Sequence, residues 1–352
     1  MFDIEFYMKS YDFMKDADAG KIKDKKTVLN FLESIRSKEP VVYNIETTNA
    51  CNMSCKMCPR TTMMTRAIET MNIDLFRKII NQLRPHNMEK WEEWERFVEE
   101  KYCIKKTDVS ENHFFLYVIP KVIQLHGYGD PLLDKNMGAY VKILVDNGFY
   151  SYFSCNPANI DIGKTLEMFE NGLNYIKYSI ESVDDERHKK IRGNASNFTE
   201  SYKKILSILE IKKEKKLKTV IVITMLDLNS EWQKDDYLKL KKLFEGKDVY
   251  IYLKSEDQQW YREDYHGTNS VHWSEFCKHP WMSMTIKSNG EAAMCMEDFN
   301  NEIVLGDATK ESLHDIWHGE RYDRFRTDHV ELAKGIKCIE SCDMKLIGNY
   351  LV

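Results

Sequence analysis

Six short runs rich in β-branched and aromatic residues alternate with amphipathic helical patterns through most of the chain. Strands that alternate with helices in this way form parallel βαβ units, so the pattern predicts an α/β fold. In such folds ligands bind beyond the carboxyl ends of the strands, and we expect the site on the loops that follow them. The predicted strands cover residues 41–47, 122–126, 150–154, 175–180, 219–225 and 249–253.

Three cysteines, Cys51, Cys55 and Cys58, follow the first predicted strand on one short loop. Iron–sulfur cubes and structural zinc ions normally take four protein ligands, but the nearest downstream histidine is His86. The loop therefore predicts a 4Fe–4S cluster with one iron left open to another ligand. Zinc is the alternative, and it is disfavoured because zinc ribbons usually offer two paired Cys-x-x-Cys knuckles.

Composition narrows the class of protein. The chain has 352 residues, nine cysteines and a net charge of -5, and its start lacks the basic and then apolar order of a signal peptide. Such cysteines are typical of metal or redox ligands in a cytoplasmic protein rather than of disulfides. The charge predicts no nucleic-acid partner, and the absence of a long apolar stretch predicts no membrane span.

The Cys-x3-Cys-x2-Cys spacing resembles the signature of the radical SAM superfamily, although Met57 stands where many members carry an aromatic residue. The resemblance implies a partial (β/α)6 TIM-type barrel whose open iron binds S-adenosyl-L-methionine. An electron from the cluster then cleaves this cofactor to methionine and a 5′-deoxyadenosyl radical, which takes a hydrogen atom from the substrate. The six predicted strands suit this barrel.

Cofactor contacts are implied by further matches to family motifs. Gly127, Gly129 and Asp130 follow the second predicted strand and resemble the Gly-Gly-Glu motif that receives the methionine amino group. Without that context they are an ordinary tight turn. Asn156 follows the third predicted strand, Ser179 lies at the end of the fourth, and Arg192 comes after the short charged helix that follows. The resemblance implies that all three contact the cofactor, Arg192 by clamping its carboxylate.

A second group of cysteines follows the barrel. The spacing Gly290-x4-Cys295 and the stretches around it resemble the SPASM or twitch domain of radical SAM enzymes. A full SPASM domain carries seven cysteines and two clusters, so four cysteines predict one fully ligated 4Fe–4S cluster, and two clusters in the chain. Zinc is the alternative occupant. The four predicted ligands are Cys277, Cys295, Cys338 and Cys342.

Three segments are expected along the chain: a helical extension over 1–40, a barrel over 41–255 and a SPASM or twitch domain over 256–352. An insertion over 87–120 is predicted to form a helix packed on the barrel wall, or alternatively a lid or a partner-binding helix. The extension is too short for the leader-recognition domain of many peptide-modifying relatives, which lowers the expectation of a peptide substrate.

The predicted function is that of a radical SAM oxidoreductase. A fully ligated auxiliary cluster favours accepting an electron, so the expected reaction is oxidation of a sugar, cyclitol or nucleotide-linked metabolite, as in twitch dehydrogenases. The alternatives are a peptide or protein maturase, which forms a crosslink, an epimer or an oxidised residue, and a noncatalytic scaffold. A flavodoxin or ferredoxin would supply the electron.

Catalytic residues are less constrained by the pattern. Cys155, at the end of the third predicted strand, could donate a hydrogen atom to a substrate radical, or could simply pack in the core. A proton acceptor is expected in the polar, aromatic linker over 258–266, where Tyr261, Arg262 and His266 are the candidates.

Overall fold

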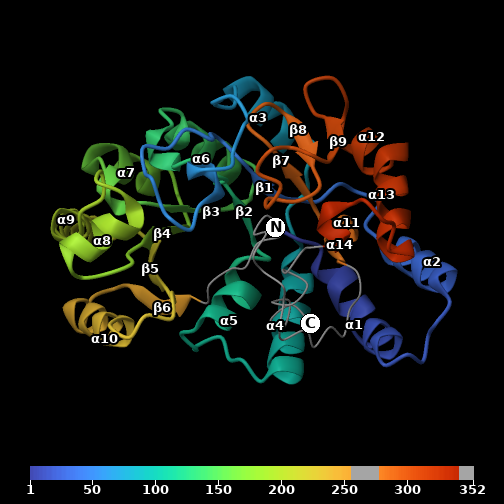
Figure 1. Cartoon of the computed structure of the whole chain (residues 1–352), viewed down its shortest axis with the longest axis horizontal. Coiled ribbons are helices and arrows are strands. Elements are labelled where there is room, and N and C mark those ends of the chain that lie inside the picture. The colour runs from blue at the N-terminus through green and yellow to red at the C-terminus, as the bar shows by residue number, and fades with distance from the viewer. Residues whose placement is uncertain (255–276, 341–352) are drawn as a thin grey trace.

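The computed structural model describes residues 1–254 and 277–340, and its nine strands form one curved sheet in the order β6-β5-β4-β3-β2-β1-β7-β8-β9 (Figure 1). The first six strands are parallel to one another, which confirms the predicted partial barrel. Each predicted strand is present, with ends within two residues of those expected: β1 (Val42–Ile45), β2 (Val122–Gln124), β3 (Tyr150–Cys155), β4 (Tyr175–Ser179), β5 (Val220–Leu226) and β6 (Tyr250–Lys254).

A C-terminal meander continues this sheet on the other side of β1. Strand β7 (Met284–Ile286) runs parallel to β1, with Val42 opposite Met284 and Ile45 opposite Ile286. Strands β8 (Glu291–Ala293) and β9 (Val304–Asp307) then pair antiparallel. The residues that follow β7 therefore lie beside the carboxyl end of β1, where the cysteine loop begins.

Six helices cover the convex side of the barrel strands (Figure 1): α3 (Ile73–Ile80), α6 (Met137–Asp146), α7 (Ile162–Glu170), α8 (Asp185–Arg192), α9 (Phe198–Glu214) and α10 (Gln233–Leu243). Strand residues such as Phe153 and Ile223 share a core with Phe76 and Ile205 of these helices. Because side chains alternate along a strand, their neighbours point to the concave side. Tyr152, Val222 and Tyr252 form a separate cluster there.

The N-terminal extension forms α1 (Ile4–Asp18) and α2 (Lys25–Ile35), and α1 packs against α4 (Met88–Tyr102) of the insertion. Tyr7 meets Trp94 edge to face, with ring centroids 5.2 Å apart. The indole Nε1 of Trp94 donates to the Leu116 carbonyl at 2.7 Å. The predicted helix therefore exists, but its apolar face lies on α1 rather than on the barrel wall.

The rest of the insertion enters the barrel from the concave side. It forms α5 (Glu111–His113) and a π-helical turn, η2 (Phe114–Val118). The Phe114 ring lies 5.4 Å from that of Tyr152 and 5.5 Å from that of Tyr252. His113 Nδ1 lies 2.8 Å from the hydroxyl of Tyr250, the first residue of β6. The insertion thus fills the barrel interior toward the amino ends of its strands.

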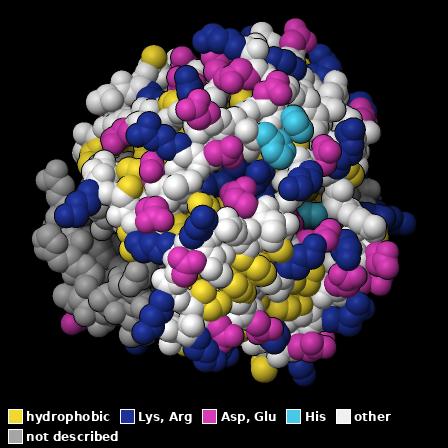
Figure 2. Space-filling model, turned by 90° about the vertical axis from the view of Figure 1, so that its right-hand side faces the viewer, with side chains coloured by type: hydrophobic (Ala, Val, Ile, Leu, Met, Phe, Trp, Pro, Cys, Tyr) yellow, Lys and Arg dark blue, Asp and Glu magenta, His cyan; other side chains and the backbone are white. Residues whose placement is uncertain are grey.

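The C-terminal region adds α11 (His279–Met282), α12 (Leu313–Trp317), α13 (Glu320–Glu331) and α14 (Lys337–Glu340). Acidic and basic side chains are interspersed over the face that carries α12, α13 and α2 in Figure 1, so this face shows no extended field of one sign (Figure 2). Among the described residues, no helix is both long enough and apolar enough to cross a membrane.

Candidate functional site

The cysteine loop rests on the C-terminal end of α8. Ser54 N donates to the Arg192 carbonyl at 3.1 Å and Lys56 N to the Ile191 carbonyl at 2.9 Å. The last carbonyls of a helix lack partners within the helix, so they are available to hold this loop. Gly193 permits the close approach, because it has a φ of +98° and a Cβ there would lie 2.2 Å from Ser54 Oγ.

Burial disfavours ionisation of two of the loop thiols, Cys51 and Cys58. Burial, with smaller contributions from Cys55 and Cys51, raises the pKa of Cys58 to about 11. Burial also raises the pKa of Cys51, whose Sγ accepts a hydrogen bond from Met53 N at 3.4 Å. Among the described residues, no three metal-binding side chains already surround a metal-sized position. Three adjacent soft donors that repel one another as thiolates nevertheless fit an iron–sulfur cluster, which stabilises the thiolate form.

Arg192 is a fixed cation beside this loop. Its Nη1 donates to Cys55 Sγ at 3.5 Å, and its Nη2 forms an ion pair with Glu181, whose other oxygen accepts from Leu226 N at 2.8 Å. Burial acts to lower the pKa of Arg192, but Glu181 and then Cys55 raise it above its usual value. The sequence alone did not predict this role for Glu181. The contact of Arg192 with the cofactor carboxylate stays a prediction.

The glycine turn packs tightly against the start of the cysteine loop. A Cβ on Gly129 would lie 2.3 Å from the Thr48 carbonyl oxygen and 2.8 Å from that of Ala50, and one on Gly127 would lie 2.4 Å from Glu46 Oε2. The next amide, Asp130 N, donates to the Ala50 carbonyl at 2.8 Å. The two glycines therefore allow the backbone after β2 to lie directly against the start of the cysteine loop.

Asp130 and Asn156 hold the loops after β2 and β3 together. Asp130 Oδ2 accepts from Asn156 N at 3.0 Å and from Asn159 Nδ2 at 2.9 Å, while Oδ1 accepts from Leu132 N at 3.0 Å. Burial raises the pKa of Asp130. The Asn156 amide donates to Ser196 Oγ at 3.1 Å. Both side chains thus already form hydrogen bonds within the protein, and their direct contact with the cofactor stays a prediction.

Ser179 and Cys155 lie on opposite faces of the sheet. Ser179 Oγ is 3.5 Å from Ser154 Oγ on the concave face. Cys155 lies in the convex core with Tyr178, and its thiol donates to the Lys177 carbonyl at 3.7 Å. Burial raises the pKa of Cys155 well above its usual value. This position agrees with the alternative that Cys155 packs in the core, and a role as hydrogen-atom donor to the substrate stays an untested prediction.

The other predicted catalytic residues, Tyr261 and His266, lie outside the described residues, as do Arg262 and the fourth predicted ligand, Cys342.

Sequence analysis missed a set of polar side chains on the concave face of β7, β1 and β2. Asn44 lies opposite both Gln124 and Thr285 in the strand register, and all three residues are at most 3 % exposed. Across the described part of the chain, Asn44 Oδ1, Gln124 Nε2, Thr285 Oγ1 and the Nδ1 atom of His126 are buried without a hydrogen-bond partner. Each such atom costs about 1–3 kcal/mol unless a ligand or water satisfies it.

A buried charge network joins this region to the C-terminal meander. Glu46 is fully buried and accepts from Arg66 Nη2 at 2.8 and 2.9 Å and from Ser288 Oγ at 3.1 Å. Burial acts to raise the pKa of Glu46, but Lys287 and Arg66 outweigh it and hold the pKa below 4.5. Burial lowers the pKa of Lys287, which Glu46 opposes. These partners lie far apart in the sequence, which therefore did not predict the network.

Two of the three described C-terminal thiols accept a hydrogen bond from the amide two residues later. Cys277 Sγ accepts from His279 N at 3.4 Å, and Cys295 Sγ accepts from Glu297 N at 3.3 Å. Cys51 makes the same bond to the amide two residues later. Cys338 is buried, with its Sγ 3.8 Å from His329 Nε2. Backbone N–H donors favour the thiolate form that iron requires.

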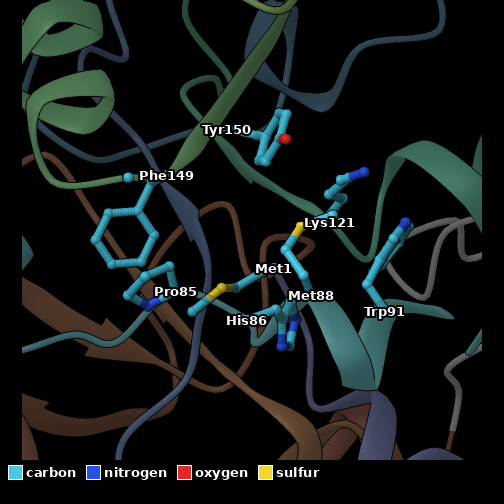
Figure 3. Close-up of a pocket in the computed structure, with 9 residues that line it drawn as sticks. Met1, Pro85, His86, Met88, Trp91, Lys121, Phe149 and Tyr150 are labelled. Carbon is cyan, nitrogen blue, oxygen red and sulfur yellow. The ribbon is translucent and has the colours of Figure 1, made fainter. Parts of the chain in front are cut away.

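A small cavity lies at the opposite end of the barrel from the cysteine loop (Figure 3). It is bordered by Lys121, which precedes β2, by Tyr150, which begins β3, and by His86 and Trp91. Its volume of about 20 Å³ holds roughly one water molecule. It is therefore too small, and lies at the wrong end of the strands, to be the substrate site.

Comparison with known families agrees with this geometry. The family model described as the radical SAM superfamily matches residues 45–240. The chain belongs to the radical SAM superfamily. A second model, the SPASM iron–sulfur cluster-binding domain, matches residues 277–344. This radical SAM protein is therefore one that binds S-adenosylmethionine and a 4Fe–4S cluster at its barrel and auxiliary iron–sulfur in its SPASM domain.

Individual relatives are distant. The chain is 32 % identical over 148 residues to an S-adenosyl-L-methionine-dependent tRNA 4-demethylwyosine synthase from Methanocaldococcus jannaschii. That match spans 42 % of this radical SAM chain and 43 % of the relative, so it covers less than half the length of either protein.

Two solved structures are similar to this chain. Streptococcus suis SuiB bound to S-adenosylmethionine is 13 % identical with a TM-score of 0.53, over 97 % of this chain and 82 % of SuiB. BtrN in complex with AdoMet and 2-DOIA is 15 % identical with a TM-score of 0.47, over 86 % and 93 %. At this identity, the likeness to SuiB shows the radical SAM and SPASM fold alone.

Proposed function

We propose that this protein is a radical SAM oxidoreductase that oxidises a small polyol, such as a sugar or cyclitol, on the concave face of its barrel. The observation that carries the proposal is the set of buried, unpartnered polar atoms of Asn44, Gln124, His126 and Thr285. The Gln124 amide donates, Asn44 Oδ1 accepts, and the Thr285 hydroxyl does both. This mixture of neutral donors and acceptors is complementary to hydroxyl groups.

Two further features bear on the size and the charge of the substrate. The insertion fills the inner part of the barrel with Phe114 against Tyr152 and Tyr252, and this filling supports a small substrate. The Lys177 ammonium lies 5.9 Å from the Tyr152 ring centroid and places a cation on the same face. A phosphate of a nucleotide-linked sugar would be compatible with this cation.

The proposed reaction converts a secondary alcohol into a ketone. Cys51, Cys55 and Cys58 would hold the cluster that, with S-adenosylmethionine bound, would supply the chemistry for removing the hydrogen atom from carbon. The C-terminal cysteines would hold the centre that would take up the remaining electron, and the hydroxyl proton would leave to a base. Burial, and then Lys177, lowers the pKa of His126 to about 3. His126 is therefore neutral at physiological pH, so it orients a hydroxyl group by hydrogen bonding and carries no charge.

Deuterium transfer tests this function. The anaerobically reconstituted, reduced protein is incubated with S-adenosylmethionine and a panel of carbon-deuterated inositols, aminocyclitols and hexoses, and 5′-deoxyadenosine is analysed by mass spectrometry. We expect one polyol to transfer deuterium. Transfer from labelled peptides and from none of the polyols would contradict the proposal and favour the maturase alternative.

A Gln124→Met variant, assayed with the reactive polyol, tests whether the buried polar side chains of Asn44, Gln124 and Thr285 contact the substrate. The change keeps the length of the side chain but removes the donor, so kcat/KM is expected to fall by about 5-fold to 150-fold, from a loss of about 1–3 kcal/mol. Iron content should not change. The surface variant Asn81→Leu serves as the control. Unaltered kcat/KM in the Gln124 variant would exclude these polar side chains as the substrate contact.

A further inference from the structure

We propose that Lys287 sets the reduction potential of the SPASM auxiliary cluster by acting on the peptide group between Met296 and Glu297. This inference depends on the auxiliary centre and goes beyond the identity of the substrate. Lys287 follows β7, and the parallel pairing of β7 with β1 places it at the border between barrel and SPASM domain.

A chain of two hydrogen bonds links the ammonium group to a ligand sulfur. Lys287 Nζ donates to the Met296 carbonyl at 3.0 Å. The N–H of the same peptide group, on Glu297, donates to Cys295 Sγ at 3.3 Å. A donor at the carbonyl polarises the peptide and strengthens the bond from its N–H. Stronger N–H···S bonds stabilise the more negative, reduced form of a cluster and raise its potential.

The charge of Lys287 acts in the same direction. The residue is 1 % exposed, so its field is weakly screened, and it interacts electrostatically with Cys295. Glu46, Asp298 and Arg66 also interact with Lys287, so the group consists of two acids and two cations. Removing the Lys287 charge leaves this group with a net charge of -1 next to Cys295, which disfavours reduction.

The turn between β7 and β8 fixes this arrangement. Lys287 N donates to the Glu291 carbonyl at 2.9 Å, and Gly290 N donates back to the Lys287 carbonyl at 2.9 Å. Gly290 has a φ of +91°, and a Cβ there would lie 2.7 Å from Thr309 Cγ2. The tight turn returns the chain to Cys295 within a few residues, so the buried Lys287 side chain reaches the peptide group between Met296 and Glu297.

A redox titration of the auxiliary cluster alone tests the proposal. The full-length Cys51→Ala/Cys55→Ala/Cys58→Ala protein provides this background, and electron paramagnetic resonance follows the reduced cluster. Adding Lys287→Met is expected to lower the equilibrium constant for reduction about tenfold, which is about 59 mV in a one-electron midpoint potential. Lys310→Met is the matched control, because Lys310 is exposed and pairs with Asp307 at 2.7 Å; its midpoint should equal that of the parent.

A second substitution is expected to shift the midpoint potential in the opposite direction. Glu46→Gln leaves the group with a net charge of +1 and is expected to raise the midpoint, while Lys287→Arg should stay near the parent. An unchanged midpoint in Lys287→Met with normal iron content would overturn the proposal. If that variant loses its iron, an unchanged or lower midpoint in Glu46→Gln would overturn it instead. A triple-alanine parent that binds no iron would also overturn it, because the C-terminal cysteines would then hold no cluster.

Discussion

Replacing Arg192 with methionine is expected to lower the free energy of unfolding by about 3–5 kcal/mol, because it leaves the buried Glu181 carboxylate without its counter-ion. Glu181 is 1 % exposed and Arg192 is 17 % exposed, so solvent screens this pair weakly. The variant also loses the cation that faces Cys55 at 3.5 Å. We therefore expect the cysteine loop to lose most of its iron as well.

Urea unfolding and iron analysis of Arg192→Met, side by side with Arg77→Met, measure both effects. Arg77 pairs with Asp74 on the surface at 2.8 Å, with side chains 51 % and 81 % exposed. Its loss should cost less than about 1 kcal/mol. In the double variant Glu181→Gln/Arg192→Met, stability should recover in part while iron binding stays low. Full iron occupancy in Arg192→Met would show that Arg192 has no role at the cluster.

Replacing Gly129 with alanine is expected to abolish iron binding at the cysteine loop. The added methyl group would meet the backbone oxygens of Thr48 and Ala50 at 2.3 and 2.8 Å, so the loops after β1 and β2 must separate. That movement breaks the bond from Asp130 N to the Ala50 carbonyl and displaces Cys51. Overpacking of this kind typically costs about 1–3 kcal/mol, and the rigid cluster geometry makes its binding more sensitive than the fold.

The matched control is Gly163→Ala in α7, where a Cβ would have its nearest contact at 3.5 Å, to Asp161 Oδ1. We expect this variant to bind iron normally and to release 5′-deoxyadenosine at the parent rate. Gly129→Ala should release none above background. Equal iron content in the two glycine variants would contradict the role of the glycine turn in holding the cysteine loop.

The sequence was sufficient to predict the positions of the strands and of the cysteine loop, because the signals for both are local. Runs such as residues 150–154 carry their β preference in a few adjacent residues, and Cys51, Cys55 and Cys58 occupy one loop. The outward position of Cys155 was also readable in principle. Phe153 and Cys155 share one face of β3 and Tyr152 and Ser154 the other, as the two-residue period of a strand requires.

The buried charge network around Glu46 and the polar side chains of β1, β2 and β7 were not predictable from the sequence, for a different reason. Glu46 and Ser288 are 242 positions apart and meet only because β7 pairs with β1. Likewise, Asn44, Gln124 and Thr285 lie on three separate strands, and each alone reads as a strand residue. The packing partner of the inserted helix was not predicted, because an apolar helix face does not reveal whether it packs on the barrel wall or on another helix.

The most direct test of this account is the iron and sulfide content per chain after anaerobic reconstitution, in the parent protein and in the Cys51→Ala/Cys55→Ala/Cys58→Ala variant. We expect about eight iron ions per parent chain and about four in the variant, which correspond to one open and one fully ligated cube. About four iron ions in the parent and nearly none in the variant would contradict it, because no auxiliary cluster would then accept the electron of an oxidation.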